Sequence, residues 1–305
     1  MPFDYKQINL YNGQIRPSTV HCRNTALVNY HASYLFKKIL SCFEFVNLPK
    51  DWAENYFKYI LFGRGYLAVF NTERYGTIPQ ECGLTGFDVF YQPDRVTVAN
   101  PLLPTFKEMK ISTECALIKI QPDYRSVMDI VTTYSDLLSL ALETAGINLL
   151  NSKTSYVFFA EDKAMAETFK KMYDKLASGE PMQVVGSKLQ DEQGNSKWDM
   201  WSQNVGQNYI TDRLLNDYKT IKDQFNTLIG IPNANTQKRE RMLVNEVEAN
   251  DVDTQALALL WLDTIRKDLA VVNEMYGLNI SVNYRFADYY KGGEVNGNTV
   301  DSGAL

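Results

Sequence analysis

The chain has 305 residues, 45% of them hydrophobic, which is enough to bury one large or two modest cores. Its formal net charge of -5 and sequence pI near 5.3 argue against a protein that holds nucleic acid over a broad basic face, so any such contact must be local. No stretch approaches the roughly 18 apolar residues of a membrane span, and no signal-peptide pattern is visible, so we expect a soluble intracellular chain without membrane insertion.

The first predicted elements are an arm and two helices. Residues 1–24 show no periodicity, which indicates a flexible N-terminal arm. From Thr25 to about Phe45 apolar residues recur at helical spacing, and a shorter helix is predicted from Asp51 to about Phe62, stopped by Gly63-Arg64-Gly65. The first helix has two neighbouring apolar faces, Leu27, Tyr30 and Tyr34 on one, and Val28, Leu35, Ile39 and Cys42 on the other.

Between Tyr66 and Ile120 the pattern changes to that of strands. Short runs of β-branched and aromatic residues alternate with clusters of glycine, proline and aspartate, which predicts a small β subdomain. The predicted strands are Tyr66–Phe70, Phe87–Tyr91, Val96–Ala99 and Cys115–Ile120. Because helices follow these strands, the predicted fold class is α+β.

A long helix and an inserted α/β segment come next. Ser126 with Asp129 three residues later resembles a capping box, and the helix that follows is expected to stop at Gly146. The insertion is predicted to hold a strand, a helix, a second strand and a polar loop. These four elements are placed at Tyr156–Ala160, Asp162–Leu176, Met182–Val185 and Gln190–Lys197.

The C-terminal third is mostly helical. An amphipathic helix ends near Leu228, where Gly230-Ile231-Pro232 breaks it. After a polar and basic segment, a long helix is predicted from about Met242 to Tyr276, closed by a left-handed Gly277, and its buried face holds Leu262, Ile265, Leu269, Val272 and Met275. Apolar and polar residues alternate over 279–286, which predicts a half-buried strand. The Gly-rich tail at 288–305 is expected to be flexible.

A search for catalytic groups finds little. There is no phosphate-binding G-x-x-x-x-G-K-[ST] motif, and neither His21 nor His31 has the context of a general base, so both are interpreted as surface or interface histidines. The cysteines form no C-x-x-C pair, which favours free and mostly buried thiols over a metal site: Cys22, Cys42, Cys82 and Cys115. We therefore expect no cofactor, no metal and no enzymatic activity.

Two charged clusters in the last third leave alternatives open. Glu246, Glu248, Asp251 and Asp253 could serve a metal-dependent nuclease, although a solvated acidic helix face is the simpler interpretation. The one basic cluster near a helix break is Lys238-Arg239-Glu240-Arg241, which taken alone is a weak signal for binding.

Several motifs keep their order and spacing from about residue 25 to 286. The strongest are Leu228-Ile229-Gly230-Ile231-Pro232-Asn233-Ala234-Asn235, Lys238-Arg239-Glu240-Arg241-Met242, Asn245-Glu246-Val247, Asn250-Asp251, Asn273-Glu274-Met275-Tyr276-Gly277-Leu278-Asn279-Ile280 and Arg285-Phe286. Looser ones are Asn47-Leu48-Pro49, Gly83-Leu84-Thr85-Gly86 and Val96 to Pro101. In these motifs the chain resembles the upper collar, or portal, proteins of small short-tailed DNA bacteriophages such as those infecting Bacillus.

The resemblance implies a non-enzymatic ring of twelve subunits at one capsid vertex, forming the channel through which double-stranded DNA is packaged, retained and ejected. It implies a virion protein assembled in the host cytoplasm. Its partners would be the major capsid protein, a packaging ATPase and the lower collar or tail proteins. A different ring-forming tail or collar component is the alternative within the same class.

The resemblance also implies a long-helix portal fold with a division into functional parts. These are an arm (1–24), a wing (25–125), a stem helix (126–155), a clip (156–190), a loop with a second stem helix (191–229), a channel loop (230–242), a long wing helix with a strand (243–287) and a tail (288–305). Carried over by position, the DNA-facing residues of the channel loop are Asn233, Asn235, Gln237, Lys238, Arg239 and Arg241.

This expectation agrees with simple electrostatics. A duplex carries one phosphate charge per about 1.7 Å, so a channel lined throughout with lysine would hold it by counterion release. Acidic walls with one basic ring avoid that, because twelvefold repetition turns Lys238 and Arg239 into a dense ring of positive charge. The contact would be to backbone phosphates and independent of base sequence.

Overall fold

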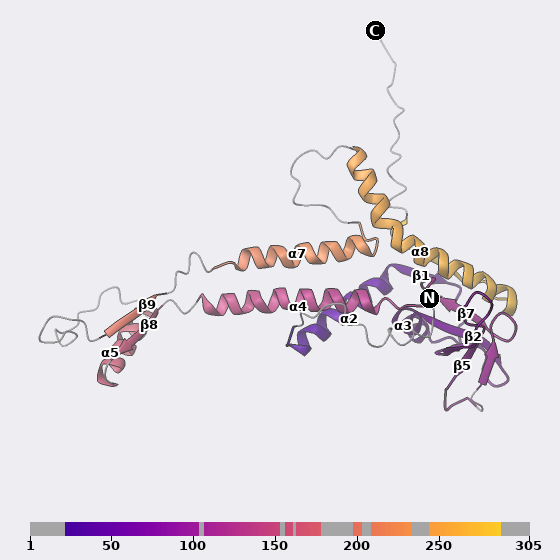
Figure 1. Ribbon diagram of the computed structural model, residues 1–305, viewed down its shortest axis with the longest axis horizontal. Coiled ribbons are helices and arrows are strands. Elements are labelled where there is room, and N and C mark those ends of the chain that lie inside the picture. Colours follow the sequence, from indigo (N-terminus) through magenta and orange to yellow (C-terminus); the bar gives the residue numbers. More distant parts are fainter. Residues whose placement is uncertain are drawn as a thin grey trace, which may run out of the picture. The chain divides into compact units, whose positions relative to one another are not determined.

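The computed structural model describes residues 22–103, 107–152, 156–160, 163–177, 198–202, 209–232 and 244–287. These residues form long helices and small antiparallel sheets, so the fold class is α+β, as predicted (Figure 1). The chain divides into a larger unit, residues 1–140 with 219–305, and a smaller unit, residues 141–218.

The first helix is shorter than predicted because a strand replaces its last turn. Helix α2 (Thr25–Ser41) begins where the Asn24 side chain accepts a hydrogen bond from the amide of Leu27, at 3.1 Å. Strand β1 (Phe43–Val46) then pairs with β10 (Ser281–Tyr284) in an antiparallel register. The predicted helical end at Phe45 is therefore wrong. Phe43 and Phe45 are buried and the residues that follow each of them are exposed, as expected in a strand. The partner of this strand lies far away in the sequence.

Only one of the two predicted apolar faces of α2 is buried. Leu35 and Ile39 are fully buried, whereas Tyr30 is 62% exposed and Tyr34 is 37% exposed. The predicted face that carries the two tyrosines therefore lies at the surface of the larger unit.

The second helix leads directly into the sheets. Helix α3 (Glu54–Arg64) ends at Gly65, whose φ of 97° is left-handed. A Cβ atom at this position would lie 2.6 Å from the backbone of Arg125, so both the turn and the close approach require glycine. The predicted stop at Gly63-Arg64-Gly65 is confirmed.

Two three-stranded sheets follow, and the core of the β subdomain lies between them. Strands β3 (Gly76–Gln80), β2 (Tyr66–Thr72) and β7 (Ala116–Lys119) form one sheet in that order. Strands β4 (Gly83–Thr85), β5 (Arg95–Val98) and β6 (Lys107–Lys110) form the other. The buried side chains of this core are Tyr66, Ala68, Phe70, Cys82, Leu84, Val96, Val98, Met109, Cys115, Leu117 and Tyr124.

The strand predicted at Phe87–Tyr91 is wrong, because these residues form a loop. The carboxylate of Asp88 accepts hydrogen bonds from the amides of Phe90 and Gln92, both at 2.8 Å, and Tyr91 has a φ of 59°. Such side-chain bonding to the local backbone competes with a sheet ladder. The alternation of apolar residues in this segment reflects exposed side chains rather than a half-buried strand.

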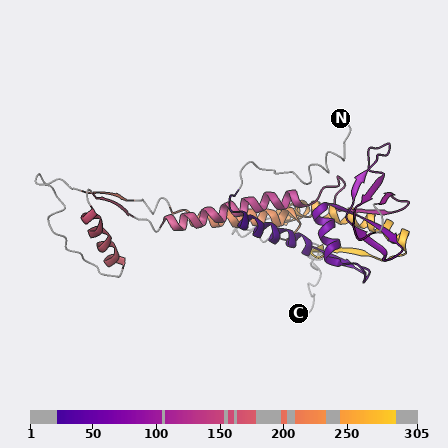
Figure 2. The ribbon, with the colours of Figure 1, turned by 90° about the horizontal axis from the view of Figure 1, so that it is seen from below.

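Three helices pack together in the larger unit (Figures 1 and 2). Helix α4 (Met128–Asn151) meets α2 where His31 contacts Ser139, and it meets α7 (Thr211–Leu228) where the rings of Tyr134 and Phe225 lie 5.4 Å apart. The third contact joins α2 to α7, because the Lys38 ammonium donates to the side-chain oxygen of Asn226. Helix α2, predicted to belong to the wing, thus packs on α4 and α7, which were predicted to belong to the stem.

Helix α4 does not stop at Gly146, contrary to prediction, but continues to Asn151. A Cβ atom at Gly146 would have no atom within 4 Å. A glycine inside an exposed helix costs only about 1 kcal/mol relative to alanine, which the neighbouring turns can absorb.

The last helix packs against strands β7 and β10 of the larger unit. Helix α8 (Val244–Tyr276) ends at a left-handed Gly277, as predicted, before β10. Four of the five predicted buried residues, Leu262, Ile265, Leu269 and Val272, are buried. The Tyr276 hydroxyl donates to the carbonyl of Val69 on β2 at 2.9 Å, which ties the end of α8 to the first sheet.

The smaller unit contains the inserted segment. Strand β8 (Tyr156–Ala160) and helix α5 (Lys163–Ala177) lie where predicted, and β8 pairs with β9 (Trp198–Ser202), a strand that the sequence analysis missed. The strand predicted at 182–185 lies outside the described residues. Within this unit, the side-chain oxygen of Asn148 accepts hydrogen bonds from the Ile210 amide and the Thr211 hydroxyl.

Candidate functional site

The six residues proposed to face a ligand lie outside the described part of the chain, so the site is defined by the two helices that flank them. The candidates are Asn233, Asn235, Gln237, Lys238, Arg239 and Arg241. Helix α7 and residues 229–232 precede them, and the backbone of α8 is described again from Val244.

The exit from α7 is a tight, buried turn. The amide of Gly230 donates to the Thr227 carbonyl at 3.1 Å, and the amide of Ile231 donates to the Asn226 carbonyl at 2.8 Å. Gly230 has a φ of 82°, and the side chain of Ile229 is fully buried. These bonds satisfy the last carbonyl groups of the helix and turn the chain sharply away from its axis.

A contact with strand β10 and helix α8 fixes this turn in place. The Tyr284 hydroxyl donates to the carbonyl oxygens of Gly230 and Ile229. A Cβ atom on Gly230 would lie 2.5 Å from the Tyr284 hydroxyl oxygen and 2.8 Å from the Cβ of Ala258. The polar segment therefore begins from a point anchored to the core.

An aromatic cluster holds Tyr284 in position. The ring of Phe43 lies 5.7 Å from Tyr284, 6.3 Å from Trp261 and 5.3 Å from Phe62. Phe43, Phe62 and Trp261 are almost fully buried, so the Tyr284 ring has little freedom to move away from the turn. Sequence reasoning placed Gly230 at a break and Tyr284 on a buried strand face, but it gave no signal that the two residues meet.

The helices of the bundle differ in charge. Helix α4 carries three carboxylates at intervals of seven residues, Asp129, Asp136 and Glu143, and its sequence contains no lysine or arginine. Because seven residues are close to two helical turns, these carboxylates share a face. Burial raises the pKa of Asp129, against the opposing effect of its hydrogen bond from the Ile130 amide and of nearby Arg125.

Basic side chains of α2 and α7 meet at one aromatic ring, although α7 carries three aspartates as well. The sequence of α2 contains Lys37 and Lys38 and no acidic residue. The ammonium groups of Lys38 and Lys222 both lie over the ring of Tyr34, 5.8 Å and 6.0 Å from its centroid. The bundle thus combines an acidic helix with a locally basic neighbour.

The histidine expectation is wrong for His31, which is fully buried between α2 and α4, while His21 lies outside the described residues. The Nδ1 atom of His31 lies 2.8 Å from the Ser139 hydroxyl oxygen. Burial lowers the pKa of His31, so the ring is neutral at pH 7 and takes a structural role. The long-range partner on α4 was invisible to local sequence reasoning.

The thiols are free and buried at all four positions, as predicted. Burial raises the pKa of Cys42 to about 12 and raises that of Cys82 as well. Because the thiolate is the reactive form, these groups are protonated and inert at neutral pH.

No cluster of metal-binding side chains occurs among the residues that the structure describes. The acidic segment from Glu246 to Asp253 has a helical backbone in α8, but its side chains lie outside the described set. Within the described helices, none has an apolar stretch long enough to cross a membrane.

Comparison with known proteins identifies one matching family. A family model described as "Phage Connector (GP10)" matches residues 4–287 of this chain. Two solved structures also align over most of the chain. In "Portal and tail of native bacteriophage P68" the matched chain is 14% identical, with 87% of this chain and 91% of that chain covered and a TM-score of 0.43. In "Virion of native gene transfer agent (GTA) particle" the identity is 11%, the coverage 93% and 89%, and the TM-score 0.43.

Proposed function

This chain belongs to the phage connector family and is a portal, or head-tail connector, protein of the virion, and we propose that twelve copies form a ring around a DNA channel. The family is structural and non-enzymatic, which confirms the prediction that the chain is not an enzyme and sets the nuclease alternative aside. The observation that carries the proposal is the match of one family model to residues 4–287.

The proposed contact with DNA is made by the channel loop. Lys238 and Arg239 would point toward the duplex in every subunit, with Asn233, Asn235, Gln237 and Arg241 beside them. Support comes from the anchored turn at Gly230, which would start each copy of the loop from the same point on the core. Twelve such pairs would give a ring of charge that binds phosphates without reading bases.

The stem of the channel is proposed to be α4 and α7. The carboxylates of α4 would repel phosphate and so keep the duplex from sticking to the wall, leaving the basic ring as the main point of contact. The clip is proposed to comprise residues 156–190, and the wing to comprise residues 25–125 together with α8 and the strand that follows it.

The specific partners also remain proposals. A ring at the portal vertex would meet the major capsid protein around its rim, a packaging ATPase during genome entry, and lower collar or tail proteins after packaging. The chain supplies no phosphate-binding motif of its own, so the energy for packaging would come from the separate ATPase.

Electron microscopy of the purified full-length protein tests the proposal. We expect rings with a central hole whose rotational symmetry is twelvefold in views along the axis. Agreement of the particle mass with twelve chains of 34.9 kDa, measured by light scattering, would be a second criterion. A protein that stays a monomer at all concentrations and salt strengths would contradict the proposal.

A further inference from the structure

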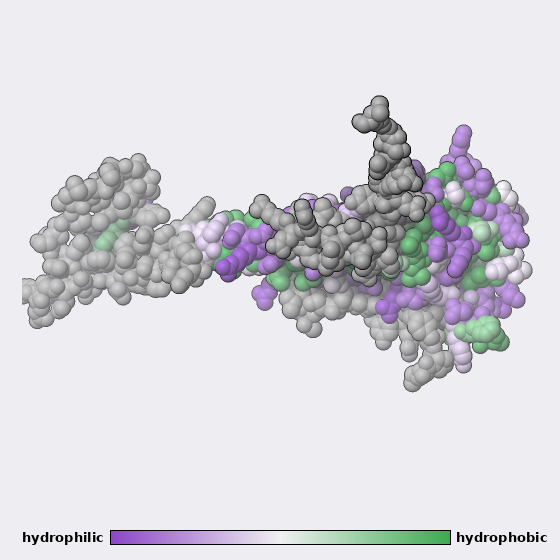
Figure 3. Space-filling view, turned by 90° about the horizontal axis from the view of Figure 1, so that it is seen from above, coloured by the Kyte–Doolittle hydropathy of each residue, from purple (hydrophilic) through white to green (hydrophobic). Residues whose placement is uncertain are grey.

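Two apolar side chains stand out on the surface of the larger unit. Val89 is 85% exposed and Phe90 is 77% exposed, and both sit on the loop of residues 87–91, called here the apolar loop. Figure 3 shows polar and apolar side chains interspersed over much of the visible surface of the larger unit. Two neighbouring apolar side chains that project this far from a fixed loop are candidates for a contact with another protein surface.

The apolar loop holds its shape through its own backbone. Asp88 closes it, since its amide donates to the Gln92 carbonyl at 2.9 Å and its carboxylate accepts from the amides of Phe90 and Gln92. The rings of Phe87 and Tyr91 pack edge to face, with centroids 6.1 Å apart. Because the loop is ordered before any contact forms, binding through it loses little conformational entropy.

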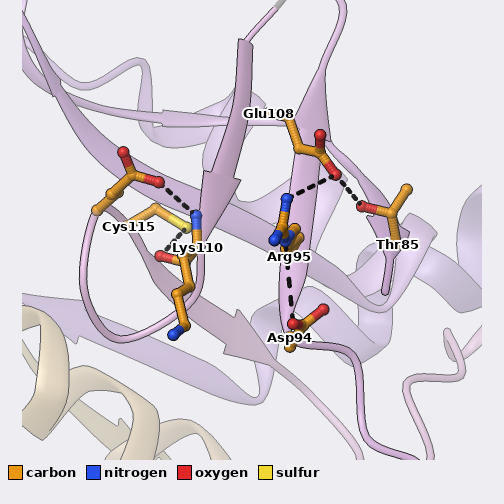
Figure 4. Close-up of polar contacts among 7 residues, drawn as sticks. Thr85, Asp94, Arg95, Glu108, Lys110 and Cys115 are labelled. Carbon is orange, nitrogen blue, oxygen red and sulfur yellow. Dashed lines mark hydrogen bonds and ion pairs between the residues drawn. The ribbon is translucent and has the colours of Figure 1, made fainter. Parts of the chain in front are cut away.

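The base of the loop is fixed to the sheet and to the core. Figure 4 shows Arg95 between Asp94 and Glu108, with the Thr85 hydroxyl donating to Glu108. These ion pairs are largely exposed and add little energy, but they join the two ends of the loop to β6. The carboxamide oxygen of Gln92 accepts from the buried hydroxyl of Tyr124 at 2.8 Å, which fastens the loop to the core.

The same subunit also carries a pocket that suits such a pair of side chains. It is a cavity of about 540 Å³, called here the wing pocket, and its size is typical of a binding cleft. The ring of Tyr56 offers aromatic surface against which a phenylalanine packs well, whereas Tyr66 behind it is buried in the core. Ala99 and Pro101 add further apolar surface.

Polar side chains contribute about as much to this lining as apolar ones. The guanidinium of Arg64 pairs with the carboxylate of Glu81 at 2.7 Å, and the Tyr56 hydroxyl accepts from the Glu81 amide at 3.0 Å. The lining therefore mixes apolar surface with hydrogen-bonded polar groups, as protein interfaces commonly do.

The loop and the pocket lie at opposite ends of one hairpin. Strands β4 and β5 meet the apolar loop where Thr85 pairs with Arg95, and they meet the wing pocket where Gly83 pairs with Thr97. A subunit cannot fill its own pocket across its own sheet. A protrusion at one end and a complementary hollow at the other produce a head-to-tail contact between identical copies, and such contacts close into rings when the rotation permits.

We propose that Phe90 and Val89 of each subunit insert into the wing pocket of the neighbouring copy and so form part of the contact between subunits. The inference rests on the proposed ring, in which the same two surfaces of adjacent copies meet at every interface. The apolar loop is the anchor of this contact, and the ion pair of Arg64 and Glu81 borders it.

Cross-linking tests the contact directly. The double variant Val89→Cys with Ala99→Cys keeps the Phe90 ring and puts one thiol on the loop and one at the pocket, while the four native thiols are buried. Under mild oxidation we expect a ladder of covalent multimers on a denaturing gel. Each single variant should give only background cross-linking, because it lacks one of the two thiols. The control pair Tyr75→Cys with Ala99→Cys should also give only background cross-linking, because Tyr75 lies on the β2–β3 turn and not on the apolar loop.

A second variant measures what the anchor contributes. Phe90→Asp should raise the protein concentration needed for half assembly on the order of tenfold or more, as truncation of a buried interface anchor does. The melting temperature of the dissociated chain should not change, because Phe90 is exposed in the subunit.

The outcomes separate this inference from the proposed function. If the wild-type protein never formed rings, the proposed ring would be wrong, and with it the proposed contact. Rings that form normally, give no ladder with the double variant and are unchanged by Phe90→Asp would overturn only the contact. Phe90→Asp rings that assemble normally but fail to enter capsids would likewise overturn it, in favour of a capsid contact for the loop.

Discussion

His31 and Ser139 meet inside the helix bundle, with the Nδ1 atom of the ring 2.8 Å from the serine hydroxyl oxygen and neither side chain exposed to solvent. The Ser139 hydroxyl donates to the Ser135 carbonyl at 2.6 Å. This network links α2 to α4 through side chains that are both buried.

The first prediction concerns the pH dependence of stability. Burial lowers the pKa of His31 below its usual 6.5, whereas the unfolded chain has the usual value. Protonation therefore favours the unfolded state, so the free energy of unfolding should be unaffected above pH 6.5 and should fall as the pH drops from 6.5 toward the folded-state pKa. Urea unfolding of the dissociated chain at pH 7.5 and pH 5.5 measures this loss.

The matched control is His31→Gln, which keeps a hydrogen-bonding side chain but has no proton to gain. Its stability should change less than that of the wild type between the two pH values. Equal losses in the two proteins would show that other groups, and not His31, cause the pH dependence.

The second prediction concerns the anchor of the channel loop. Gly230→Ala forces an L residue into a φ of 82° and drives its Cβ against Tyr284 and Ala258. We expect a loss of at least about 1–3 kcal/mol in the free energy of unfolding. Gly146→Ala is the control, because its Cβ meets nothing within 4 Å and it should stabilise α4 by about 0.5–1 kcal/mol.

Circular dichroism of both variants under identical conditions gives the comparison. If Gly230→Ala were as stable as Gly146→Ala, the turn after α7 would not be anchored as described. Adding Tyr284→Phe to Gly230→Ala removes the nearest clashing atom and should recover part of the loss.

The third prediction concerns the partly buried ion pair between β7 and α8. The carboxylate of Asp268 accepts from the Lys119 amide at 2.9 Å and from its ammonium at 3.3 Å. Burial raises the pKa of Asp268 even though Lys119 opposes this effect, so the negative charge itself is a net cost in the folded state. The hydrogen bond to the backbone is then the main contribution.

Asp268→Asn, which still accepts that bond, should cost less than about 1 kcal/mol. Asp268→Ala leaves the amide unsatisfied and should cost about 1–3 kcal/mol. Denaturant unfolding of both variants distinguishes them. Equal costs would mean that charge, rather than hydrogen bonding, holds α8 to the sheet.

Much of the helical structure could be predicted because its signal is local. The three- and four-residue spacing of Leu262, Ile265, Leu269 and Val272 sufficed to identify the buried face of α8. Likewise Gly65 and Gly277, each left-handed in the structure, marked the ends of their helices.

The errors came where a distant partner or a side chain decides the backbone. Residues 43–46 continue a helical pattern, but pairing with β10, more than two hundred residues away, makes them a strand. In the apolar loop, one Asp88 carboxylate outweighs the alternation that predicted a strand. The strand at 198–202, which pairs with β8, was missed because its partner lies about forty residues away in the sequence.

The candidate site was predictable only in outline. The break at Gly230 and the buried face of the last strand were both visible, but their meeting through Tyr284 depends on residues 54 positions apart. No local pattern encodes that contact. The roles of Lys238 and Arg239 come from the resemblance alone and remain a prediction.

The fourth prediction tests those roles. Replacing Lys238 and Arg239 by alanine removes two positive charges per subunit, and twenty-four from a twelve-subunit ring, at the proposed DNA contact. Rings should form normally, because the loop is not needed for the anchored turn at Gly230, but packaged DNA should be retained less well or ejected at a different rate. Nuclease accessibility of the packaged genome at several salt concentrations measures retention.

The control is the double variant Lys50→Ala with Arg74→Ala, which removes the same charge from exposed positions of the larger unit outside the proposed channel loop. Its particles should retain DNA as the wild type does. If Lys238→Ala with Arg239→Ala also behaved as the wild type at every salt concentration, the channel-loop assignment would fail even though the chain remained a connector. Counterion release depends on charges that touch the duplex, so only the channel-loop variant should lose DNA. If both double variants lost DNA equally, the effect would come from net charge and not from a basic ring in the channel.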